Sequence, residues 1–169
     1  MSVMVAFDAI HDHVDAIPPR PFAVGGYING AVTKYVWTAA DWAKFPDAYH
    51  IRINVTGDPD RGNALDVENG DATPADVTPW INSRGAAGAG PLLVYCNRSN
   101  LTACMAARKA AKYPAWLWLA TLDGTLAYDR AMTQIGQIRE PVHGGAVADY
   151  SFILNQTLVG QMQAKAGKQ

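Results

Sequence analysis

The chain has 169 residues, enough for one domain with a substantial core, and carries 14 Lys and Arg against 15 Asp and Glu, a net charge of −1. This balance argues against the broad basic surface of a nucleic-acid-binding protein. The N-terminal residues lack the features of a signal peptide, and no run has the length of a membrane span. We therefore expect a soluble protein with neither nucleic acid nor membrane as a partner.

Apolar, β-branched and aromatic runs, separated by turn residues, predict eight strands. Several are apolar throughout, as is typical of parallel strands buried on both faces. The predicted strands cover about residues 2–8, 22–28, 49–55, 63–68, 91–96, 115–120, 132–138 and 146–150.

Helices are predicted between some of these strands. The segment 38–41 has the Thr and Asp spacing of a capping box, and Thr73 can cap a helix whose first residue is Pro74. Pro79 either kinks this second helix or restarts it, and the sequence allows both. A third helix is expected over about residues 99–112.

The last third of the chain follows a different pattern. Segments 122–125 and 140–145 are too short or too rich in turn residues for crossover helices, so we expect hairpin-like or antiparallel strand pairs there. Because a complete (β/α)₈ barrel usually needs about 200 residues or more, the sequence predicts an α/β barrel with helices on one side only. We expect this single domain over residues 1–158 and a C-terminal tail over 159–169.

Cysteines and histidines give few chemical signals. Cys96 and Cys104 are too few for a disulfide scaffold and lack zinc-site spacing, so both are predicted to be reduced and buried. His11 and His13 could hold a metal with a third ligand, although two histidines near a loop are usually polar surface residues.

Two carboxylates end the fourth predicted strand, at Asp66 and Glu68. Side chains at i and i+2 of a strand share one face, with bases about 6.6 Å apart. Since two acids this close cannot both ionise freely, one can keep a proton while the other stays charged, as glycoside hydrolysis requires. The turn at Asn69-Gly70 would open this strand end to a ligand. The alternative is a pair of solvated acids on an edge strand, because this tripeptide pattern is common.

Acids and aromatic residues recur at strand ends in a fixed order along the chain, and this order resembles the family 25 glycoside hydrolases, lysozymes whose relatives occur in phages and actinobacteria. The resemblance covers about residues 3–155. Its elements are Ala6-Phe7-Asp8, Leu65-Asp66-Val67-Glu68, Val94-Tyr95-Cys96, Leu117-Trp118-Leu119-Ala120, Thr133-Gln134-Ile135-Gly136 and Val147-Ala148-Asp149-Tyr150.

The resemblance implies a flattened eight-stranded β/α (TIM-like) barrel that lacks several outer helices. It also implies that Glu68 is the general acid, that Asp66 is its charged helper, and that Asp8 and Asp149 complete a catalytic cluster without metal or cofactor. In the family, the acetamido group of the substrate has been proposed as the nucleophile, oriented by an aspartate. The residues expected to contact the substrate or position the acid are Tyr27, Tyr95, Trp118, Gln134 and Tyr150.

The implied function is hydrolysis of the β-1,4 linkage between N-acetylmuramic acid and N-acetylglucosamine in the glycan strands of bacterial peptidoglycan. Without a signal peptide, such an enzyme is expected in the host cytoplasm with release to the cell wall, as a phage endolysin, or on the virion. The family often shows Asp-x-Ser first and Asp-x-Asn last, where this chain has Ile10 and Ser151. These departures keep open a catalytically inactive glycan-binding or phage tail-associated barrel. A third alternative is a metal-dependent hydrolase that uses His11 or His13.

Overall fold

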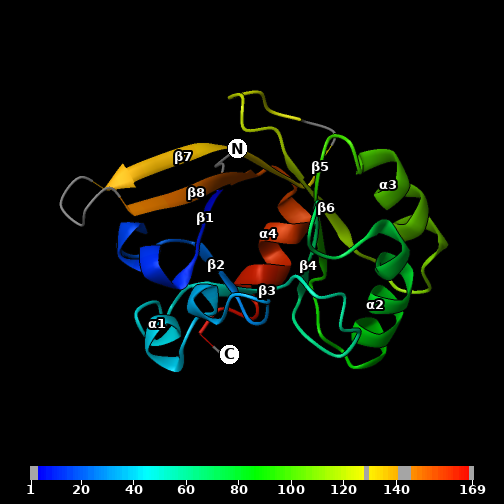
Figure 1. Ribbon diagram of the computed structural model, residues 1–169, viewed down its shortest axis with the longest axis horizontal. Coiled ribbons are helices and arrows are strands. Elements are labelled where there is room, and N and C mark those ends of the chain that lie inside the picture. Colours follow the sequence, from blue (N-terminus) through cyan, green and yellow to red (C-terminus); the bar gives the residue numbers. More distant parts are fainter. Residues whose placement is uncertain (1–3, 128–129, 141–145, 168–169) are drawn as a thin grey trace.

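The computed structural model describes residues 4–127, 130–140 and 146–167. Its eight strands close into a barrel in the order in which they occur along the chain (Figure 1). Neighbouring strands from β1 to β7 are parallel, and β8 is antiparallel to both β7 and β1. The strands are β1 (Met4–Ala9), β2 (Ala23–Tyr27), β3 (Tyr49–Asn54), β4 (Ala64–Val67), β5 (Leu93–Asn97), β6 (Trp116–Ala120), β7 (Met132–Glu140) and β8 (Ala146–Ile153).

All eight predicted strands are present, which confirms the eight-stranded α/β barrel. The antiparallel pairing of β7 and β8 is confirmed as well. The expectation of an antiparallel or hairpin-like pair after the sixth strand is wrong, because β6 and β7 are parallel, with Trp118 opposite Met132. The connection from Ala120 to Met132 is long enough to return along the barrel, and its described residues, 121–127 and 130–131, form no helix.

The helices are short and few. Those described are the 3₁₀ helices η1 (His11–Ala16) and η2 (Thr33–Tyr35) and the α-helices α1 (Ala39–Ala43), α2 (Pro74–Ala86), α3 (Leu101–Ala110) and α4 (Gln156–Gln163). The predicted capping box of α1 is present, Thr73 caps α2 as predicted and forms a capping box with Asp76, and α2 continues through Pro79.

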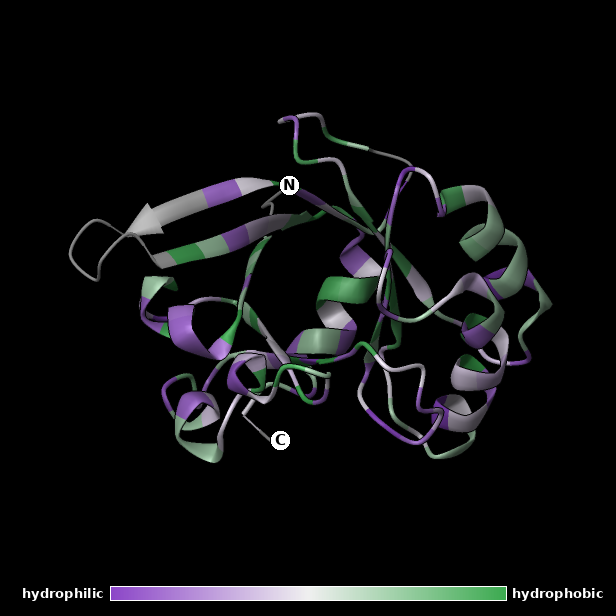
Figure 2. Ribbon diagram, viewed as in Figure 1, coloured by the Kyte–Doolittle hydropathy of each residue, from purple (hydrophilic) through white to green (hydrophobic). Residues whose placement is uncertain are grey.

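The barrel interior is a hydrophobic core built from alternate residues of the strands, since every second side chain of a strand points inward. Helix α4 closes one end of this core with Leu158, Val159 and Met162, all buried. Figure 2 shows hydrophobic residues along the central strands and on α4. The tail expected from residue 159 therefore begins inside a core helix, which the Asn155 side chain caps by accepting hydrogen bonds from two backbone N–H groups.

Helices α2 and α3 lie together on one side of the barrel (Figure 1), where they pack against the outer faces of β4, β5 and β6. Cys96 and Cys104 are buried free thiols in this layer, as predicted. On another side, residues of η1 pack against β1 and β2 in a cluster that also contains Trp37, which precedes α1. The Trp37 indole donates a 2.7 Å hydrogen bond to the Ala9 carbonyl. The end of β7 and the start of β8 extend away from the barrel (Figure 1).

Candidate acidic site at the barrel mouth

The topology brings the four predicted acids to one end of the barrel, opposite α4. Asp8 and Asp66 lie near the carboxyl ends of two parallel strands, and Glu68 follows directly after the end of β4. Because β8 runs in the opposite direction, its early residue Asp149 reaches the same end and stands directly opposite Asp8. The charges of Asp149, Asp66 and Glu68 each raise the pKa of Asp8, as expected of neighbouring carboxylates.

The four acids differ in burial, and their pKa values follow that difference. Asp8 and Asp66 are 6% and 3% exposed, whereas Glu68 is half-buried. Burial raises the pKa of Asp8 well above its ordinary value, with Asp149 as the next cause. Burial, followed by the charge of Glu68, raises the pKa of Asp66 to about 8. This shift favours the protonated form of Asp66 near neutral pH, whereas the resemblance implies a charged helper at this position.

Glu68 remains accessible while its pKa is also raised. Burial is the main cause, followed by the charges of Asp71 and Asp149. Among the described residues, one oxygen each of Asp8, Asp66 and Asp149 is buried without a hydrogen-bond partner. Buried polar atoms are normally paired, so the three orphaned oxygens indicate a site that receives hydrogen bonds from a ligand or holds protons.

A buried amide links the acids to an aromatic residue. Gln134 is 2% exposed, and its Oε1 accepts a 2.5 Å hydrogen bond from the Tyr95 hydroxyl. Its Nε2 lies 3.5 Å from Oδ2 of Asp8, and its side chain also bonds to Asp149. Gln134 therefore lies buried between the Tyr95 hydroxyl and the two acids.

Two other residues expected to contact sugar lie elsewhere. Trp118 is 1% exposed inside the barrel, where its indole donates a 2.9 Å hydrogen bond to Oγ of Ser151. Tyr150 follows Asp149 in β8 and so projects from the opposite face of the strand, where its ring meets Phe152 edge-on. The structure contradicts a sugar-stacking role for both, because strand alternation and core packing fix their side chains away from the mouth.

Tyr27 faces two pockets that meet at the barrel mouth. The smaller has a volume of about 310 Å³ and is lined by both Asp8 and Asp149. The larger has a volume of about 530 Å³ and lies between the end of β2 and the turn after β4. Both volumes are in the range of small-molecule sites, about 300–1,000 Å³. Glu68 lines neither pocket, although Asp71, whose charge acts on it, lines the larger one.

Two residues of this site were missed by the sequence analysis. Asp71 donates its backbone N–H to the Glu68 carbonyl at 3.2 Å, and its charge raises the pKa values of Glu68 and Asp66. Its position just beyond Asn69-Gly70 was the available signal. Gly25 lies beside Asp8 in the β1–β2 register, and a Cβ there would stand 2.7 Å from Cβ of Asp8. That contact depends on strand register, which the sequence alone does not reveal.

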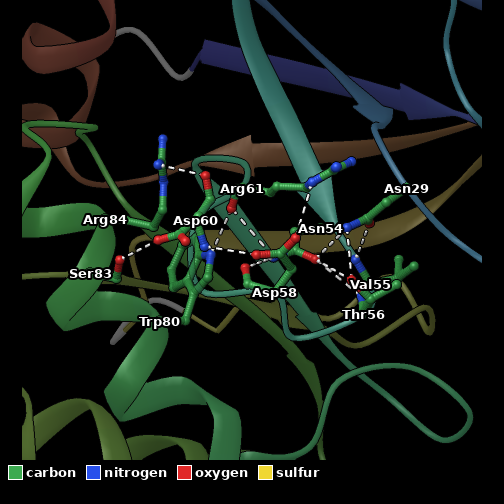
Figure 3. A network of polar contacts seen from close by, with 10 residues as sticks. All are labelled: Asn29, Asn54, Val55, Thr56, Asp58, Asp60, Arg61, Trp80, Ser83 and Arg84. Atoms are coloured by element: carbon green, nitrogen blue, oxygen red, sulfur yellow. Dashed lines mark hydrogen bonds and ion pairs between the residues drawn. The ribbon is translucent and has the colours of Figure 1, made fainter.

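A polar network centred on Asn54 supports one wall of the larger pocket (Figure 3). Asn54 is fully buried; its Oδ1 accepts a 2.8 Å bond from Asn29, and its Nδ2 donates a 2.7 Å bond to the Asp58 carbonyl. The same loop is tied to α2, because the Arg61 carbonyl accepts a 2.8 Å bond from the Trp80 indole. Because both ends of the Asn54 amide are hydrogen-bonded, they hold the loop against the wall of the pocket.

His11 and His13, the two histidines of the metal hypothesis, have different surroundings. His11 contacts Oδ2 of Asp41 at 2.7 Å through its Nδ1, and Asp41 belongs to the capping box of α1. His13 lines the smaller pocket. In the part of the chain that the structure describes, no group of three or more His, Cys, Asp and Glu side chains is arranged to hold a metal ion.

Comparisons of the chain with protein-family models, curated proteins and solved structures gave no match. Among the described helices, none has the length and apolar character needed to cross a membrane. The class that the fold defines is therefore a closed mixed β-barrel with an acidic mouth, and the assignment of its function depends on the chemistry of that mouth.

Proposed function

We propose that this protein is a glycoside hydrolase of the family 25 lysozyme type, with a flattened TIM-like barrel that lacks several outer helices. Its substrate would be the peptidoglycan glycan strand, cleaved at the β-1,4 linkage between N-acetylmuramic acid and N-acetylglucosamine. It would act as a phage endolysin or as a virion-associated enzyme. The observation that carries the proposal is the convergence of Asp8, Asp66, Glu68 and Asp149 at the mouth. Burial raises the pKa values of all four, and the charges of neighbouring acids add to the effect for Asp8, Asp66 and Glu68.

Glu68 is the best candidate for the general acid. A general acid needs a raised pKa and must reach the leaving oxygen of the substrate. Asp66 has the raised pKa but is 3% exposed, whereas Glu68 has a raised pKa and is half-buried. Glu68 therefore protonates the glycosidic oxygen in this mechanism, and neutral Asp66 supports it without adding a second charge beside it.

The remaining acids are candidates for stabilising the positive charge that develops on the sugar ring. An oxocarbenium-like transition state develops positive charge on the sugar ring, which a carboxylate nearby stabilises. Asp149 lines the smaller pocket and is less buried than Asp8, so it is the better candidate for a carboxylate that orients or stabilises the reacting sugar. Tyr27 lies where the two pockets meet, and its flat ring with a polar tip suits a pyranose.

The test is the release of reducing sugar from purified peptidoglycan by the wild type and by Glu68→Gln, with Asp47→Asn as the control. Asp47 is exposed, so its change from acid to amide leaves the mouth untouched. We expect Glu68→Gln to lower the rate by about 100-fold or more, as for other general acids, and Asp47→Asn to match the wild type. Equal rates for wild type and Glu68→Gln would contradict the proposal.

A glycan-binding barrel without turnover is the second candidate, and one observation favours it. Glu68 lines neither mouth pocket, while Asp8, Asp149 and Asp71 do. A phage tail or envelope protein that binds glycan would show this arrangement without needing an acid catalyst. Calorimetric titration with soluble peptidoglycan fragments would then give binding heat in both wild type and Glu68→Gln, with no release of reducing sugar from either.

A further inference from the structure

Asp8 and Asp149 form an acidic pair between the first and last strands. They stand directly opposite each other in the antiparallel register of β1 and β8. Opposed residues in such a pair have Cβ atoms about 4.5–5.5 Å apart, and like charges at this spacing repel. Burial of Asp8 strengthens that repulsion, because a low-dielectric environment screens charges poorly. The repulsion therefore favours one negative charge and one proton on this pair over two negative charges.

The orientation of Gln134 is set by its three neighbours. Its Oε1 accepts from the Tyr95 hydroxyl, so its NH₂ group is turned toward the two acids, 3.5 Å from Asp8 and bonded to Asp149. An amide NH₂ group donates hydrogen bonds and does not accept them. It therefore stabilises a charged carboxylate more than a protonated one.

Gln137, from the same strand, makes the environments of the two acids unequal. It stands opposite Asp149 in the β7–β8 register, and its side chain also bonds to the Asp149 carboxyl. Asp149 thus has two amide contacts and partial exposure. Among the described residues, Asp8 has a single contact at 3.5 Å and is almost fully buried, while each of the two acids retains one unpartnered oxygen.

We propose that Gln134 and Gln137 are positioning residues that place the single charge of this pair on Asp149 and leave the proton on Asp8. The mouth then offers a hydrogen-bond donor on β1 and a charged acceptor on β8, both on the smaller pocket. A neutral sugar fits this pattern when it presents an amide or hydroxyl with its oxygen toward Asp8 and its N–H or O–H toward Asp149. A catalytic role for this arrangement, with Asp149 charged and Asp8 protonated, rests on the proposed hydrolase function. The arrangement itself does not depend on that function.

The other ionisable groups around the pair act on Asp8 more than on Asp149. Burial and the charges of nearby acids raise the pKa of Asp8, whereas the bonds from Gln137 and Gln134 oppose the effect of burial on the pKa of Asp149. The titratable groups that face the pair or line its pocket are Asp66, Glu68, Tyr27, Tyr95 and His13.

The experiment is a pH titration of the aspartate carboxyl carbons by ¹³C NMR in the ligand-free protein. In the wild type, Asp149 should ionise at lower pH than Asp8. Both Gln134→Met and Gln137→Met keep the side-chain length but lose the amide, so each should raise the midpoint of Asp149 by about one pH unit, the worth of one hydrogen bond to a charged group. Gln161→Met, on α4 at the other end of the barrel, is the control and should leave both midpoints unchanged.

Two results would overturn the proposal: Asp8 ionising before Asp149 in the wild type, or an unchanged Asp149 midpoint in Gln137→Met. Because Gln137 is exposed, its variant should fold even if the buried change at Gln134 prevents folding. Failure of the proposed hydrolase function is distinguishable, since a protein that releases no sugar can still show Asp149 ionising first. Conversely, an active enzyme with the reverse order of ionisation would refute the positioning role alone.

Discussion

Replacing Asp66 by Asn should remove a large part of the pH dependence of folding stability. The folded pKa of Asp66 is about 8, above its ordinary value of 3.8, because the carboxyl is buried beside Glu68. A carboxyl with a raised folded pKa binds its proton more tightly in the folded state. Its contribution to stability is therefore complete below about pH 4 and is lost progressively as the pH rises toward 8.

The size of the effect follows from the same shift. Between about pH 5 and pH 8, the folded protein stays protonated at Asp66 while the unfolded chain is ionised, at a cost of about 1.4 kcal/mol per pH unit. Three units give a loss of about 4 kcal/mol in the wild type that Asp66→Asn, with its uncharged amide, does not suffer. At about pH 4 or below the two proteins should differ little, since protonated Asp and Asn have similar shape and charge.

Urea unfolding of wild type and Asp66→Asn at about pH 4, 6 and 8 measures this difference. Asp47→Asn, which changes an exposed carboxylate, is the matched control and should follow the wild type at every pH. If the difference in free energy of unfolding between wild type and Asp66→Asn grew by less than about 1 kcal/mol across this range, burial would not hold the Asp66 carboxyl protonated, and the raised pKa of Asp66 would be refuted.

Three further changes test how the barrel supports the site. Gly25→Ala should lower the free energy of unfolding by about 1–3 kcal/mol and reduce glycan cleavage or binding, because its Cβ would press on Asp8; urea unfolding and the sugar-release assay check both, and unchanged values would contradict the close approach. Asn54→Ala should cost about 1–3 kcal/mol, since it leaves the part-buried Asp58 carbonyl and Asn29 amide without this partner, and chemical unfolding that shows less than about 0.5 kcal/mol would contradict the network. Thr38→Ala should lose about 1 kcal/mol with the α1 capping box, measured by thermal unfolding, and should leave sugar release intact.

The number and order of the strands could be predicted because each strand has its own local signal. Runs such as Leu93–Asn97 combine β-branched or aromatic residues with flanking turn residues, so composition alone marks them. Pairing direction after β6 could not be predicted, since it depends on how the connection between β6 and β7 crosses the barrel surface. The C-terminal helix was missed because Val159 and Met162 contact a core formed by residues distant in sequence.

The acids of the site were found from their positions at strand ends, yet their charge states were not. The spacing of Asp66 and Glu68 shows that they share a face, but burial of Asp66 depends on the closed barrel around it. Trp118 and Tyr150 have the chemistry of sugar contacts, and only strand alternation and core packing show that they lie away from the mouth. Residue type therefore identified candidates, and three-dimensional context decided among them.

The pairing of β8 with both β7 and β1 has a consequence for how the molecule is made. During synthesis, β1 and β7 remain open edges that can pair with other chains until β8 emerges and joins both. Asp8 likewise meets Asp149 only at that moment, because the two lie on the first and last strands. Until β8 has emerged from the ribosome, a nascent chain therefore exposes both sheet edges and lacks the complete acidic mouth, so its dependence on chaperones should fall once β8 is available for pairing.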